Sequence, residues 1–133
     1  MCLNIKNVKQ SKPTKPIIAW KVVTKDDMGR IYSLFRDSFV WKNGLNISSR
    51  RTTKLTKDEI KWQDVYSGFH CLISRSTAIR CSKSKDVFCN CDDFVVMKVV
   101  MKVVIQPEDF VAIGTFERKQ CIVATKVTAT LPT

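Results

Sequence analysis

Short apolar runs separated by polar turns fill the first third of the chain. Residues 17–24 (IIAWKVVT) are mostly β-branched or aromatic, which favours a strand. The polar stretch 25–30 and a second apolar run over 31–35 follow, an order typical of a β-hairpin. Gly44 and the polar residues 46–54 predict a loop.

The clearest helix signal is a capping box in mid-chain. Thr56 can cap the first turn and Glu59, three residues later, can reach back to it. Leu55 and Ile60 have the spacing of the hydrophobic staple that often accompanies this motif. We therefore expect a short helix over residues 57–65.

A second strand and helix follow Gly68. The apolar run 69–73 predicts the strand. Ser74 or Ser76 can cap a helix that continues to about Ser82.

The last third has the strongest strand pattern. Residues 94–105 (FVVMKVVMKVVI) are rich in valine and end before Pro107. Lys98 and Lys102 share one face of such a strand, because side chains alternate between faces. The opposite face is predicted to line the core with Val95, Met97, Val99, Met101, Val103 and Ile105.

Two further strands, over 110–116 and 121–130 around a turn at 117–120, complete the expected sheet. The order of elements predicts an α+β fold, with a small, mostly antiparallel sheet and two short helices. Residues 17–133 are the predicted single domain.

Residues 1–16 are predicted to be a flexible basic arm. Pro13 and Pro16 exclude a helix there, and the lysines lack an apolar stripe. The lysines of the arm are Lys6, Lys9, Lys12 and Lys15.

Composition agrees with one globular domain, since 44% of the 133 residues are hydrophobic and 26% are charged. No apolar run reaches the roughly 18 residues of a membrane span, and the first twenty residues lack the apolar core of a signal peptide. We expect a cytoplasmic protein without a membrane partner. Its six cysteines are therefore expected to be reduced.

The net charge of +11 is unevenly distributed. Residues 1–85 carry a net charge of +12 and residues 86–133 a net charge of −1. A basic region of this kind attracts polyanions and phosphorylated ligands. The alternative is that the excess charge only keeps a small protein in solution.

Four short motifs resemble a family of small uncharacterised proteins carried by phages and prophages. They are Met1-Cys2-Leu3, Trp20-Lys21-Val22, Gly68-Phe69-His70 and the strand end 103–107 (VVIQP). The chain departs from the family pattern at Asp109, where relatives usually have glycine. The resemblance implies an origin in a mobile element and an α+β fold, but it brings no assigned activity.

Cysteine and histidine are spaced poorly for a metal. Zinc sites usually take two close ligand pairs such as Cys-x2-Cys, whereas this chain has Cys89-x-Cys91 and the adjacent His70-Cys71. We expect buried or surface thiols and neither a metal nor another cofactor. A zinc site is the alternative, with candidate ligands Cys81, Cys89, Cys91 and His70.

No catalytic constellation is evident. His70 is the only histidine, and the chain has no nucleophile-elbow, P-loop or dinucleotide-binding pattern. We predict no catalytic residues and a binding protein rather than an enzyme. One enzymatic alternative is a likeness to ADP-ribosyltransferase cores, through the strand at residues 20–22, Ser33 and Gly68-Phe69-His70, but a catalytic glutamate is missing.

The candidate anion-binding residues extend from the predicted loop onto both helices. Arginine offers a bidentate fork to phosphate, and an exposed Trp62 can stack on a base. The alternative is that Trp62 packs into the core behind a solvated lysine face. The full set is Arg50, Arg51, Lys54, Lys57, Lys61, Trp62, Arg75 and Arg80.

These observations predict a small phage-type accessory protein that binds a phosphorylated anion and counters a host system. The ligand is either nucleic acid or a signalling nucleotide. A protein that blocks a host protein by surface contact is the remaining class. Nothing in the sequence fixes the oligomeric state.

Overall fold

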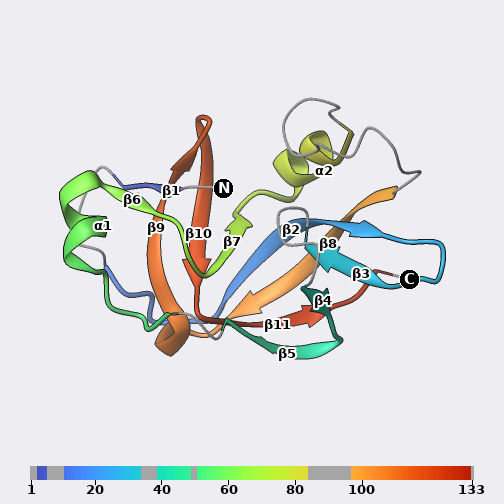
Figure 1. Cartoon of the computed structure of the whole chain (residues 1–133), viewed down its shortest axis with the longest axis horizontal. Coiled ribbons are helices and arrows are strands. Elements are labelled where there is room, and N and C mark those ends of the chain that lie inside the picture. Colours follow the sequence, from blue (N-terminus) through green and yellow to red (C-terminus); the bar gives the residue numbers. More distant parts are fainter. Residues whose placement is uncertain (1–2, 6–10, 34–38, 49–50, 84–96, 133) are drawn as a thin grey trace.

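The computed structural model describes residues 3–5, 11–33, 39–48, 51–83 and 97–132. These residues form a sheet of eleven strands with two α-helices (Figure 1). The strands are β1 (Leu3–Asn4), β2 (Ile17–Lys25), β3 (Ile31–Ser33), β4 (Val40–Trp41), β5 (Gly44–Ile47), β6 (Asp64–Val65), β7 (Phe69–Leu72), β8 (Met97–Ile105), β9 (Phe110–Phe116), β10 (Lys119–Ala124) and β11 (Lys126–Thr130). The helices are α1 (Lys57–Trp62) and α2 (Arg75–Lys83), and a 3-10 turn spans Pro107–Asp109.

The sheet is mostly antiparallel, as predicted, but it is larger than the small sheet expected. Its main path runs β5-β11-β8-β2-β7-β10-β9-β1-β6, with β3 paired to β2 and β4 paired to β3. β2 and β8 form the longest pairing, from Ile17 opposite Ile105 to Lys25 opposite Met97. The predicted β2–β3 hairpin is confirmed over the described residues.

Both faces of the long strands bury apolar side chains. On one face, Val23 of β2 belongs to a cluster that includes Trp41 and Phe69. On the other face, Val22 belongs to a cluster that includes Ala78 and Cys81 of α2. The predicted core face of β8 is confirmed at Met101, Val103 and Ile105, which are fully buried, and Val99 is partly buried; Val95 and the side chain of Met97 lie outside the described residues.

The single strand predicted over 121–130 is two strands, β10 and β11. Thr125 lies between them, and its amide donates to the carbonyl of Asp109 at 2.9 Å. Beyond this residue the chain leaves β7 and β9 and pairs with β8 and β5 instead. The preceding turn is tighter than expected, because Glu117 and Arg118 both have positive φ and Lys119 already belongs to β10.

The predicted flexible arm does not hold at its start, because Leu3–Asn4 form β1 of the sheet and Ile5 is hydrogen-bonded beside it. Asn4 pairs with Thr115 of β9, and the Ile5 amide donates to the carbonyl of Gln63 at 2.8 Å. Leu3 and Ile5 are fully buried. Leu3 and Ile5 flank the polar Asn4, and this alternation is typical of a strand. The lysines later in the segment suggested a solvated arm instead.

The predicted capping box of α1 is present. The Thr56 hydroxyl accepts from the Glu59 amide at 3.1 Å, and the Glu59 carboxylate accepts from the Thr56 amide at 2.9 Å. The helix ends earlier than predicted, because Gln63 adopts the left-handed conformation and the next two residues pair with β1. Among the described residues, no helix is long and apolar enough to cross a membrane.

Replacement of Gly114 by alanine tests whether β1 packs against β9 at this position. A Cβ at Gly114 would collide with the carbonyl oxygen of Asn4, so the alanine has to displace β1. We expect a loss of about 1–3 kcal/mol in the free energy of unfolding, measured by urea denaturation. Thr115→Ala, at the neighbouring position of β9, is the control and should cost less; equal stability of the parent and Gly114→Ala would show that β1 does not lie there.

Candidate anion-binding site

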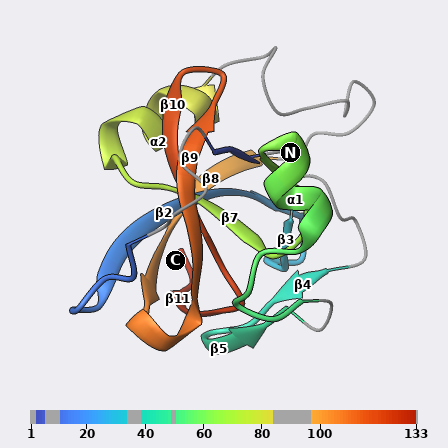
Figure 2. The same cartoon turned by 90° about the vertical axis from the view of Figure 1, so that its left-hand side faces the viewer.

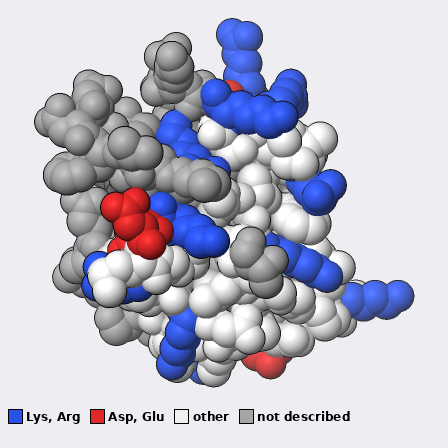
Figure 3. Space-filling model, turned by 90° about the vertical axis from the view of Figure 1, so that its right-hand side faces the viewer, with Lys and Arg blue, Asp and Glu red and all other residues white. Residues whose placement is uncertain are grey.

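The predicted anion-binding residues do not converge on one place. Lys57, Lys61 and Trp62 are on α1, whereas Arg75 and Arg80 are on α2. The two helices lie on different sides of the molecule in both views (Figures 1 and 2). Arg50 lies outside the described residues. Basic side chains are nevertheless widely spread, as one side of the surface shows (Figure 3).

Helix α1 buries a carboxylate and exposes its apolar side chains. Glu59 is the only buried residue of the helix, whereas Ile60 and Trp62 are 44% and 63% exposed. The Lys61 ammonium lies 5.1 Å from the centre of the Trp62 ring. The interpretation of Trp62 as a core residue is therefore wrong, and an apolar face does not hold this helix in place.

Arg51 is removed from the anion-binding set, because its guanidinium is already engaged. Its Nη1 and Nη2 atoms lie 2.7 and 3.1 Å from the two carboxylate oxygens of Glu59. Nη1 also donates to Ser67, while Nε donates to the carbonyl of Thr52 and Nη2 to that of Lys54. Only 4% of the side chain is exposed. Sequence reasoning missed this role because the partner is eight residues away and the fold has to bring it near.

The ion pair keeps Glu59 charged. Burial alone would raise the pKa of this carboxyl, but its hydrogen bonds to Arg51 and to the Thr56 amide hold the pKa below the usual value. Glu59 therefore caps its own helix and fixes the loop of Arg51 at the same time. The loop over 51–55 is therefore held against α1 through Glu59.

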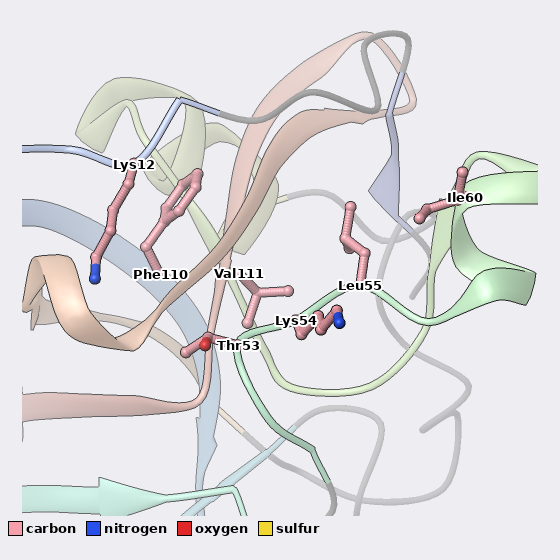
Figure 4. A pocket seen from close by; sticks show the side chains of 7 residues that line it. All are labelled: Lys12, Thr53, Lys54, Leu55, Ile60, Phe110 and Val111. Carbon is pink, nitrogen blue, oxygen red and sulfur yellow. The ribbon is translucent and has the colours of Figure 1, made fainter.

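That loop forms one wall of a pocket of about 340 Å³ (Figure 4). Lys12 lines the pocket from the N-terminal segment, and Thr53 and Lys54 line it from the loop. The remaining lining residues are apolar: Leu55, Ile60, Phe110 and Val111. Leu55 and Ile60 are the two residues of the predicted hydrophobic staple.

Two lysines thus line a largely apolar pocket. Lys12 and Lys54 are exposed, and no salt bridge between described residues involves either side chain. The charge of Lys12 also acts on Asp109, whose pKa is raised by burial although the charges of Lys126 and Lys12 lower it. Of the pocket residues, only Lys54 belongs to the predicted set; Thr53, Leu55 and Ile60 are near it in the sequence, and Lys12, Phe110 and Val111 come from distant segments.

The arginines of α2 lie over other elements. The Arg75 guanidinium is 5.5 Å from the centre of the Trp20 ring on β2. Arg80 donates to the hydroxyl of Thr77 within the helix at 3.4 Å. These residues form no site with Lys54.

His70 is buried, and both of its ring nitrogens lie against backbone carbonyls rather than open space. Its Nε2 and Nδ1 lie 2.9 and 3.1 Å from the carbonyl oxygens of Val65 and Gly68. Burial and the charge of Lys21 together lower the pKa of His70 to about 4, although the contacts with the two carbonyl oxygens raise it. His70 is therefore neutral at pH 7 and is removed from the zinc candidates.

The cysteines add no ligand set within the described part of the chain. Cys71, Cys81 and Cys121 are buried free thiols, and burial raises the pKa of each. No three His, Cys, Asp or Glu side chains gather there. Cys89 and Cys91 lie outside the described residues.

No family model, curated protein or solved structure matches the chain.

Replacement of Glu59 by alanine tests the ion pair. It leaves the Arg51 guanidinium buried without its partner, which typically costs about 3–5 kcal/mol. We expect that fall in the free energy of unfolding from chemical denaturation. Asp58→Ala, on the exposed side of the same helical turn, should change stability little. Similar losses in the two variants would contradict the structural role of Glu59.

The pH dependence of stability tests the burial of His70. Because its pKa is about 4 in the folded protein and about 6.5 when unfolded, the stabilisation is fully present above pH 6.5 and is lost as the pH falls towards 4. The shift corresponds to about 3 kcal/mol. His70→Gln should show a shallower loss of stability between pH 6.5 and 4 in the same denaturation series. Parallel curves for parent and variant would mean that His70 titrates normally.

Proposed function

We propose that the protein binds a small phosphate-bearing molecule, such as a signalling nucleotide, in the pocket beside α1. The observation that carries this proposal is the placement of Lys12 and Lys54, two cations from distant segments, around one otherwise mostly apolar cavity. Lysine ammonium groups bind phosphate as point charges, and the Thr53 hydroxyl adds a hydrogen-bonding group.

The apolar lining favours a ligand with an organic body over inorganic phosphate. Leu55, Ile60, Phe110 and Val111 offer contact surface to a base or sugar edge. A volume of about 340 Å³ is at the small end of the range for small-molecule sites. The cavity therefore suits one nucleotide unit better than a long strand.

Binding is favoured over catalysis. The only histidine is buried against two backbone carbonyls, and the pocket lining includes no carboxylate or thiol. Sequestration of a signalling nucleotide in the cytoplasm would suit an accessory protein of the phage type that the sequence resembles.

Removal of both pocket lysines tests this proposal. Lys12→Ala combined with Lys54→Ala should weaken binding of adenosine monophosphate or a cyclic dinucleotide by about tenfold or more, because two charge-assisted contacts are lost. Isothermal titration at two salt concentrations measures the effect. The matched control is Lys57→Ala combined with Lys61→Ala, which removes the same charge from α1 outside the pocket.

The control should retain binding within about twofold of the parent. An equal loss in both double variants would mean that overall charge, not the pocket, attracts the ligand. Binding by the parent to a labelled oligonucleotide alone, with a steep salt dependence, would favour the nucleic-acid class instead.

A further inference from the structure

A straight row of side chains crosses four neighbouring strands on one face of the sheet. Leu45 of β5 is opposite Thr128 of β11, Thr128 is opposite Val104 of β8, and Val104 is opposite Ile18 of β2. Residues directly opposite one another point to the same face, so these four side chains are neighbours. At the usual strand spacing the row is about 14 Å long.

The row is mostly apolar, with Thr128 as its one polar member, and its side chains are at least partly exposed to solvent. Ile18 and Leu45 are 51% and 48% exposed, and Ile47, two residues along β5 on the same face, is 53% exposed. Thr128 is exposed and Val104 is partly exposed. Contiguous exposed apolar side chains of this kind usually mark an interaction surface.

Helix α2 covers a different part of the same face. Its buried residues Ala78 and Cys81 cluster with Val22 and Val100, which pair with each other further along β2 and β8. The side chains on the opposite face of these strands, such as Val103, are fully buried. The row is thus the part of this sheet face that the helix leaves open.

The surroundings of the row are basic. The sequences of β2, β8 and β11 contain lysines, and none of these strands or β5 contains aspartate or glutamate. Lys102 is exposed next to the row and lies opposite Trp20. The Arg75 guanidinium in turn lies over the Trp20 ring. On the other side of the row is the exposed Lys126, whose charge acts on Asp109.

We propose that this row is the docking surface for another protein, one that presents aliphatic side chains bordered by carboxylates. Aliphatic groups gain by burial against aliphatic groups, and the basic border requires an acidic counterpart. A nucleic acid fits less well, because the row has no aromatic ring for base stacking and Arg75 already lies over Trp20. A second copy fits less well too, since it would bring the same basic border against itself.

The inference is independent of the pocket, which is lined by other elements. A photo-cross-linking amino acid, p-benzoylphenylalanine, placed at Thr128 in the full chain inside the cells that produce it tests the surface. The expected product is an adduct with one acidic protein, identified by mass spectrometry. The same group placed at Arg118, in the exposed turn between β9 and β10, should not give this adduct.

If the row is the docking surface, formation of the adduct must depend on the apolar side chains of the row and on the lysines beside it. Leu45→Glu and Lys102→Glu should each reduce it by about tenfold or more, whereas charge reversal at the exposed Lys83 of α2 should leave it unchanged. The melting temperature of each variant shows whether it is folded, and Leu45→Ala repeats the test if Leu45→Glu unfolds. An adduct with a second copy or with nucleic acid, an adduct insensitive to both substitutions, or no adduct would overturn the proposal.

Discussion

The buried ion pair between Arg51 and Glu59 is the interaction on which the candidate pocket depends. Helix α1 leaves its apolar residues largely exposed, and Glu59 is its only buried side chain. Through this one carboxylate the helix is capped at its start and joined to the loop that carries Lys54. A buried pair of this kind adds little net stability over an apolar pair of the same size, but it fixes one geometry, because either charge alone is costly.

The turn at Gly68 is constrained by the same arginine. Gly68 has a φ of 102°, and a Cβ there would lie 2.9 Å from the Cδ of Arg51 and 2.8 Å from a methyl group of Val123. The Arg51 side chain therefore fills the space that any larger residue would need. Three segments of the chain, the loop over 51–55, α1 and the turn over 67–68, meet at one guanidinium.

Local sequence patterns predicted local structure well. The capping box at Thr56, the β2–β3 hairpin and the core face of β8 depend on neighbours within a few residues, and all three are present. The sequence patterns failed where the structure of a segment depends on a partner far away in the sequence. Two strands share the apolar run 121–130 because Thr125 bonds to Asp109, and the pocket joins Lys12 to Phe110 across most of the chain. Arg51 looked like a phosphate ligand because its charge is visible in the sequence and its buried partner is not.

Identification of the molecule that stays bound to the purified protein tests the pocket most directly. Native mass spectrometry and ultraviolet absorbance should find a small phosphorylated compound at about one per chain after gentle purification from its own cells. The Lys12→Ala and Lys54→Ala double variant should lose it. Retention of the same compound by that variant, or a long nucleic acid in its place, would contradict binding in the pocket.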